Sequence, residues 1–122
     1  MKMKQTDVLA LWRHVLVTSL HQEAPDLTAR QMALLLTVYT IDGPHTVRGL
    51  AESLKISKPA VTRALDRLSE LDFARRKRDE ADRRNVLIQR TVKGSVFLSE
   101  FAAIIAAAVE AKLPGQPNDR SE

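Results

Sequence analysis

Apolar residues recur at the spacing of an α-helix over most of the chain, which predicts a mainly helical protein. We expect a first helix over residues 5–22. A second helix is expected after Thr28, because Thr28 and Gln31 have the spacing of a capping box ahead of an apolar run that reaches Tyr39. The apolar stripe of the first helix consists of Val8, Leu11, Trp12, Val15, Leu16 and Leu20. Both patterns are typical of amphipathic helices.

Two further helices are predicted on either side of a tight turn. The segment Asp42–His45 (DGPH) has the composition of a turn, and Thr46 can cap a short helix after it. Residues 55–57 then lead into the next helix, which Ser57 can cap and which has Pro59 in its first turn. The inward faces of the two helices contain Val47, Leu50, Ala51 and Leu54, and then Val61, Ala64, Leu65 and Leu68. The polar face of the second one contains Lys58, Thr62, Arg63, Asp66 and Arg67.

The periodicity changes after Leu71. Residues 73–78 and 85–90 suit two strands around a charged tip, and together they predict a β-hairpin that packs on the helices, because it is too small to be stable alone. Thr91 can cap a last helix over residues 91–113, and the stretch 114–122 has the composition of a disordered tail.

This order of elements predicts a winged helix-turn-helix, a mainly α-helical fold with a small β-hairpin wing at residues 73–90. We expect one domain over residues 1–113. In the helix-turn-helix unit, Ala51 allows close approach of the helices, Ile56 fills the turn and Val61 anchors the second helix. Lys55 stands where the turn often has glycine, so it must accept a positive φ or the turn must differ slightly.

Positive charge is concentrated in the same part of the chain. The net charge of the 122 residues is +4, and the segment 55–84 alone has ten basic and six acidic residues. Such a concentration suits binding to nucleic acid, although a solvated basic face explains the charge equally well.

The absence of cysteine excludes disulfides and thiolate metal sites. No apolar stretch reaches the roughly 18 unbroken residues of a membrane span, and no signal peptide is recognisable, so we expect a cytoplasmic protein with no membrane partner.

Three stretches of the chain resemble the MarR-type transcriptional regulators in order and spacing: LAESLKISKPAVTRALDRLSELDFARR, DEADRRNVLI and TVKG. The resemblance covers roughly residues 28–98. It implies that Arg84 of the wing enters the minor groove of DNA, that Asp82 orients Arg84, and that Arg83 contacts a phosphate. Asp72 departs from the glycine that is usual after the recognition helix, although aspartate tolerates a left-handed turn. The chain also lacks a clear second C-terminal helix of the kind that helps to build the dimer in the family.

The residues themselves suggest the same partner. The outer face of the second helix of a helix-turn-helix fits the major groove of DNA, where Thr62 and Arg63 would face base edges. Ser57 and Lys58, at the positive end of the helix, would hold phosphate, and Arg67 lies on the same polar face. We expect only some members of the run Arg75–Arg78 to face DNA, since strand residues alternate. The alternative for the wing is that Asp79, Asp82, Arg83 and Arg84 only pair with one another in solvent.

Features of an enzyme or a metal site are weak in this sequence. His14 and His21 lie on roughly one helix face without a third ligand, and Asp66 and Glu70 are better explained as local charge balance than as an acid–base pair. We therefore predict no catalytic residues, no metal and no cofactor. A small-molecule effector is a further option, in an apolar pocket that would be lined by Trp12, Met32, Leu36, Phe97 and Phe101, for which core packing is the alternative use.

The last helix is apolar on nearly all sides, with Phe97, Phe101, Ile104, Ile105 and Ala108 along one stripe. A small monomer cannot bury such a helix on every side, so we expect the terminal helices to form a homodimer that binds a pseudo-palindromic site on double-stranded DNA. The function that follows is a sequence-specific regulator of transcription, a repressor that a small ligand would release. The alternative is a winged-helix interaction module whose basic face binds an acidic protein.

Overall fold

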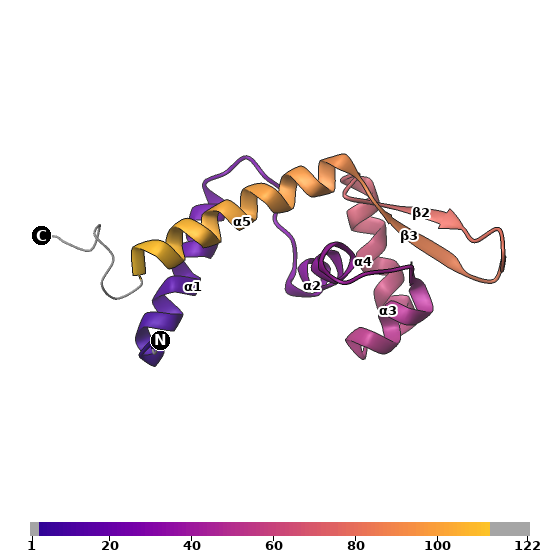
Figure 1. Ribbon diagram of the computed structural model, residues 1–122, viewed down its shortest axis with the longest axis horizontal. Helices are drawn as coiled ribbons and strands as arrows, with labels where there is room; N and C mark the ends of the chain where they lie inside the picture. The colour runs from indigo at the N-terminus through magenta and orange to yellow at the C-terminus, as the bar shows by residue number, and fades with distance from the viewer. Residues whose placement is uncertain (1–2, 113–122) are drawn as a thin grey trace, which may run out of the picture. The chain divides into compact units, whose positions relative to one another are not determined.

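The computed structural model describes residues 3–112, and these divide into two compact units. One unit comprises the described residues up to Ala24 together with those from Leu98 onward, and the other comprises Pro25–Phe97. The elements in chain order are α1 (Gln5–Leu20), α2 (Ala29–Thr40), β1 (His45–Thr46), α3 (Val47–Leu54), α4 (Lys58–Glu70), β2 (Ala74–Arg78), β3 (Val86–Arg90) and α5 (Val92–Lys112) (Figure 1). The predicted mainly α-helical winged fold is confirmed. Leu113 and the predicted tail 114–122 lie outside the described residues, and the single domain over 1–113 stays a prediction.

The core of the unit Pro25–Phe97 lies among α2, α3 and α4. The capping box of Thr28 and Gln31 begins α2, Thr46 accepts a hydrogen bond from the Gly49 N–H at the start of α3, and Ser57 caps α4. These caps position three amphipathic helices whose apolar faces meet. The fully buried side chains there are Leu34, Leu35, Val38, Leu50, Val61, Leu65 and Leu68. Truncating one of these leucines to alanine would cost about 2–5 kcal/mol, because it removes buried methyl groups and leaves a cavity.

The turn between α3 and α4 has a positive φ at Lys55, one of the two alternatives expected from the sequence. Lys55 has φ 57° and ψ 44°, the left-handed conformation that glycine adopts most easily. The N–H of Ile56 donates to the carbonyl oxygen of Ala51 at 3.1 Å and closes the turn. Ala51 is 8% exposed and Val61 is fully buried, so the small residue and the anchor stand where the helix-turn-helix needs them.

The sheet has one strand more than the predicted hairpin. Its order is β1-β3-β2, all antiparallel, with His45 opposite Ile88 and Thr46 opposite Leu87. The prediction of a simple turn over Asp42–His45 was therefore incomplete, because His45 already belongs to β1. Two residues are too few to show an alternating pattern, and their partner strand is far along the sequence, so only the folded chain defines this strand.

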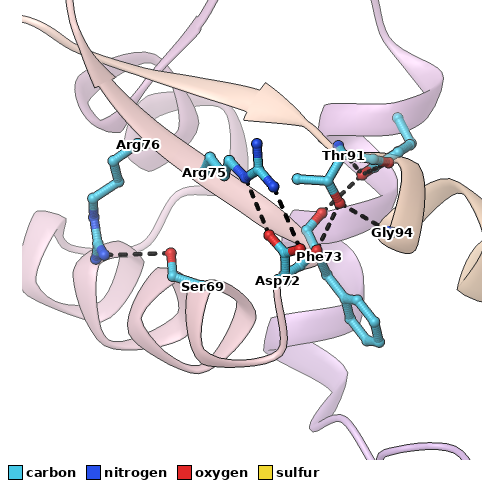
Figure 2. Close-up of polar contacts among 8 residues, drawn as sticks. Ser69, Asp72, Phe73, Arg75, Arg76, Thr91 and Gly94 are labelled. Carbon is cyan, nitrogen blue, oxygen red and sulfur yellow. Dashed lines mark hydrogen bonds and ion pairs between the residues drawn. The ribbon is translucent and has the colours of Figure 1, made fainter.

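A hydrogen-bonded junction joins the end of α4 to the start of α5 (Figure 2). Asp72 has φ 59°, as expected for the residue in the glycine position, and its carbonyl oxygen accepts from the Thr91 hydroxyl at 2.7 Å. The Thr91 hydroxyl also accepts from the Gly94 N–H at 2.9 Å, which confirms Thr91 as the cap of α5. A Cβ atom on Gly94 would overlap the Tyr39 hydroxyl and the Phe73 carbonyl, so this position requires glycine. The TVKG stretch thus fixes the base of the wing.

The other unit contains α1 and residues 98–112 of α5. Helix α1 ends at Leu20, earlier than the predicted residue 22, because the N–H groups of His21 and Gln22 donate to the oxygens of Thr18 and Ser19 in tighter turns of the 3₁₀ type. Only Val15 of the α1 stripe is buried, and Leu11 is half-buried. The remaining members are exposed: Val8, Trp12, Leu16 and Leu20.

Helix α5 has a mixed exposure. Ala108 is buried, Phe101 and Ile104 are half-buried, and Ile105 is 37% exposed. Among the described residues α5 is the one helix long and apolar enough to cross a membrane by length and composition alone, which is weak evidence for a membrane protein.

Candidate nucleic-acid interface

The outward face of α4 is polar, basic and exposed. Lys58, Thr62 and Arg63 are all exposed on it, and Arg67 is half-buried, with its guanidinium 3.9 Å from the Glu70 carboxylate. Within residues 3–112, Lys58 and Arg63 have no hydrogen bond or ion pair to another side chain. Their charges are therefore available to a partner outside the chain.

The N-terminus of α4 is at the start of the same face. The Ser57 hydroxyl accepts a hydrogen bond from the Ala60 N–H at 3.2 Å, and Ser57 remains exposed. Pro59 lies in the first turn, where its missing N–H leaves no intrahelical bond unmade. The partial positive charge of this helix end adds to that of Lys58, which makes it suited to an anionic group.

At the tip of the wing, the Asp82 carboxylate accepts three hydrogen bonds from Arg84. The Nε and Nη2 atoms of Arg84 donate to the two carboxylate oxygens of Asp82, each at 3.0 Å, and the Arg84 N–H donates to Oδ1 at 3.2 Å. The Arg84 side chain is nevertheless 87% exposed. The arginine is thus oriented by its neighbour and still accessible.

The electrostatics of this pair follow from its geometry. The side-chain hydrogen bonds from Arg84 lower the pKa of Asp82 below its ordinary value, and the Arg84 backbone N–H adds to the effect. Desolvation opposes these contributions, while the positive charge of Arg48 on α3 lowers the pKa of Asp82 slightly further. The same pair raises the pKa of Arg84. Asp82 therefore remains a carboxylate at neutral pH and keeps Arg84 in place.

Further contacts shape the rest of the tip. The Arg83 guanidinium lies 3.4 Å from the Glu80 carboxylate, and Asp79 accepts from the Ala81 N–H at 2.9 Å. From β2, the Arg78 guanidinium donates to the Arg83 carbonyl oxygen at 2.8 Å. Of the four residues that the alternative interpretation would pair with one another, only Asp82 and Arg84 do so, and the Arg83 and Arg84 side chains remain 73% and 87% exposed.

The four basic residues of β2 have different surroundings. Arg75 is paired with Asp72 at 3.1 Å, Arg76 reaches α4, and Arg78 holds the tip. Among the described residues, Lys77 alone of the four has no polar partner. Figure 2 shows Arg75 directed to Asp72 and Arg76 directed to Ser69. Of the four consecutive basic residues, three arginines therefore bond to other parts of the described chain, and one lysine does not.

Sequence reasoning missed two aspects of this surface. It gave no role to Arg48, an exposed residue of α3 whose charge acts on Asp82. It also gave no role to the bond between Arg76 and α4. The available signal was weak in both cases, because an exposed arginine has the same appearance in a sequence whichever acid or carbonyl it meets.

Two further questions raised by the sequence concern a metal ion and an effector pocket. Among residues 3–112 no group of three or more His, Asp or Glu side chains is placed to hold a metal ion. The residues suggested for an effector pocket are divided between the two units: Trp12 and Phe101 belong to one, and Met32, Leu36 and Phe97 to the other. Phe97 is buried and its ring stacks on that of Phe73 at 4.5 Å between centroids, which is core packing, whereas Trp12 and Leu36 are 50% and 38% exposed. The pocket stays a prediction.

Comparison with known proteins agrees with the fold. Residues 27–86 match the MarR family. Among curated proteins, none matches the chain significantly. The YusO protein from Bacillus subtilis is 24% identical with a TM-score of 0.69, over 84% of this chain and 70% of that chain.

The similar structures include complexes with DNA. A MepR–DNA complex from S. aureus is 23% identical with a TM-score of 0.71, over 82% of this chain and 80% of that chain. A MarR variant from E. coli complexed with operator DNA is 22% identical with a TM-score of 0.65, over 88% of this chain and 71% of that chain. The chain has the winged helix-turn-helix fold of these proteins, and its residues 27–86 match the MarR family.

Proposed function

We propose that the protein is a DNA-binding regulator of transcription that acts in the cytoplasm. The observation that carries the proposal is the exposed outward face of α4, on which Lys58 and Arg63 have no partner within the described chain. A helix with such a face fits the major groove, and unpaired cations cost no intramolecular bond when they meet DNA. Similar proteins solved as complexes with DNA support the same function.

The proposed contacts divide into three kinds. Thr62 and Arg63 face base edges in the major groove, where an arginine can make two hydrogen bonds to a guanine. Ser57 and Lys58, at the N-terminus of α4, bind phosphate, as do Arg67 and Arg83 at the edges of the interface. Arg84 enters the minor groove, which attracts a weakly hydrated cation where it is narrow, and Asp82 keeps the guanidinium oriented for that entry.

The regulator is proposed to act as a homodimer. In the described chain α1 exposes Val8, Leu9, Trp12, Leu16 and Leu20, between 43% and 64%, which is more apolar surface than one helix of a soluble monomer usually presents. A second copy that covers this surface and the exposed part of α5 would place two recognition helices about one turn of DNA apart, which requires a pseudo-palindromic site. Such a dimer would repress by occupying a promoter, and a small ligand bound near the terminal helices would release it.

The test is selection of bound duplexes from a random DNA library with the full chain, followed by titration of the selected duplex at several salt concentrations. We expect a two-fold symmetric site and a slope of log K against log salt of about −0.9 for each phosphate neutralised. The interaction-module alternative predicts no enriched sequence, together with binding to an acidic polypeptide that is as tight as binding to any duplex.

A further inference from the structure

Arg76 connects the wing to the recognition helix by three contacts. Its Nη2 atom donates to the Asp66 carboxylate at 2.7 Å and to the Thr62 carbonyl oxygen at 3.1 Å, and its Nη1 atom lies 3.5 Å from the Ser69 hydroxyl. All three acceptors belong to α4, whereas Arg76 belongs to β2. The side chain is 32% exposed, half the 66% of its neighbour Arg75.

The strand register explains why only this arginine reaches the helix. Arg76 stands opposite Ile88, which is buried, so its side chain leaves β2 on the face that packs against the helices. Arg75 lies on the other face and pairs with Asp72 at the base of the strand. In Figure 2 the Arg76 side chain extends to Ser69 on α4, and that of Arg75 points to Asp72.

The same strand continues to the tip that would meet the minor groove. Two residues after Arg76, Arg78 donates to the Arg83 carbonyl oxygen, and the adjacent Arg84 is held by Asp82. The connection from α4 to Arg84 therefore passes through Arg76, along β2 to Arg78, and through the Arg83 carbonyl to the next residue, Arg84. At the other end, the Thr62 carbonyl that Arg76 binds belongs to the turn of α4 that carries Arg63.

We propose that Arg76 is a positioning residue, which couples the wing to the recognition helix so that Arg84 and Arg63 meet DNA as one rigid unit. The proposal rests on the proposed function. A hairpin of two five-residue strands is marginally stable by itself and would sample several orientations without an anchor. If the hairpin became ordered only upon binding, the entropy lost would reduce the affinity for DNA. The Arg76 bridge orders the hairpin before binding and so removes much of this loss.

The first test removes the acid that Arg76 binds. Asp66→Asn deletes a negative charge from the surface that faces DNA, so electrostatics alone would tighten binding to every duplex. If the bridge positions the wing, Asp66→Asn instead weakens binding to the selected duplex by about threefold or more, an effect of the size that coupled residues show. Asp66 is 61% exposed, so the exchange leaves the fold intact, which thermal unfolding would verify.

Glu70→Gln is the matched control for that test. Glu70 lies one turn further along α4, is 71% exposed and has no bond to the wing, with Arg67 at 3.9 Å as its neighbour. It makes the same change of charge, and we expect it to bind the selected duplex as tightly as the parent or more tightly. If Asp66→Asn binds as tightly as Glu70→Gln, the bridge has no positioning role and the proposal is wrong.

The second test is a double-mutant cycle between Arg76 and Arg84, two residues of the wing that have no bond to each other. In a wing without its anchor, Arg84 contributes little to DNA affinity. We therefore expect the factor by which Arg84→Ala weakens binding to the selected duplex to be at least about threefold smaller in the Arg76→Ala background than in the parent. Arg75→Ala, which removes the same charge from the next residue, should leave the effect of Arg84→Ala unchanged. An equal effect in all three backgrounds would overturn the proposal.

These outcomes separate the inference from the function on which it rests. If the parent chain selects no sequence from the library, the proposed function fails before any variant is compared. If the parent selects a site and discriminates against other sequences, but Arg76→Ala and Asp66→Asn do so equally well, only the coupling role of Arg76 fails. A purely structural role would lower the unfolding temperature of Arg76→Ala without altering the Arg84 effect.

Discussion

The two basic surfaces of this molecule hold their cations in opposite ways. On α4, Lys58 and Arg63 extend from a rigid helix and have no partner among the described residues. On the wing, Arg78, Arg83 and Arg84 are each bonded to a carbonyl or a carboxylate nearby. A helix fixes the direction of its side chains through its backbone, whereas a short exposed hairpin needs side-chain bonds for the same purpose. The cations of α4 are therefore directed by the helix backbone alone, whereas those of the wing are directed by bonds within the chain.

The largest effect is expected from a substitution that splits the proposed dimer, because one subunit alone brings its α4 and wing to only one half of the DNA site. Ile105 is 37% exposed on α5, and Ile105→Glu would place a charge in the proposed dimer interface. Because two linked half-sites gain about 10²–10⁴ in affinity over one, operator binding should be lost while the helix-turn-helix stays folded. Light scattering at micromolar concentration measures the mass directly. A parent particle of 13.6 kDa would already contradict the dimer.

The next largest effect is expected on base preference, from replacing Arg63 of α4. Arg63→Ala should relax the preference at one position of each half-site, by the roughly 1–3 kcal/mol that a bidentate arginine contributes to discrimination. A library selection repeated with the variant would measure this position by position. An unchanged selected sequence would remove Arg63 from the base-reading residues.

A smaller effect is expected from the tethered arginine of the wing. Arg84→Ala should weaken operator binding by about tenfold at 0.15 M salt and reduce any preference for A·T-rich flanks, because a narrow minor groove is formed by such sequences. Its thermal stability should match that of the parent, since an exposed arginine contributes little to folding. The wing assignment fails if the variant binds as tightly as the parent.

The pairing of Asp82 and Arg84 leads to a prediction about pH. Because the pKa of Asp82 is lowered in the folded chain, the pair is intact above the ordinary aspartate pKa and breaks only as the pH falls through the lowered value. The ratio of operator affinities of the parent and Asp82→Asn should therefore be constant between about pH 5 and pH 8. Titrations of both proteins at several pH values measure this ratio, and a change within that window would contradict the intact pair.

The smallest effect should come from the cation at the end of α4. Lys58→Ala removes one proposed phosphate contact, so it should weaken binding to all duplexes alike, by about fivefold at 0.15 M salt, and reduce the salt slope by about one. Parallel titrations of the selected and a scrambled duplex measure both quantities. If Lys58→Ala and Arg63→Ala gave identical profiles, the proposed division between phosphate and base contacts would be refuted.

Much of the framework follows from local sequence. The caps at Thr28, Thr46, Ser57 and Thr91 were predictable because each is set by a hydroxyl and an amide three residues apart. The left-handed conformation of Lys55 was one of two alternatives that the sequence left open, the other being a slightly different turn, and only the structure decides between them.

Features that depend on distant residues could not be predicted in the same way. Strand β1 exists only because β3 pairs with it, and Arg76 differs from Arg75 only through the strand register that turns it toward α4. The early end of α1 depends on a competition between two turn geometries that the apolar pattern does not register. On the candidate interface, the sequence therefore indicates where the cations are, and the folded chain decides which of them are free.

The most direct test of the account is the ratio of affinities of the full chain for its selected duplex and for a scrambled duplex of equal length and composition. Competition titrations at about 0.15 M salt provide this ratio without assumptions about the fold. A regulator that reads DNA through α4 and the wing should prefer the selected duplex by at least about 10³-fold. Equal affinity for both duplexes would contradict sequence-specific recognition and would leave only a basic surface that binds acidic partners.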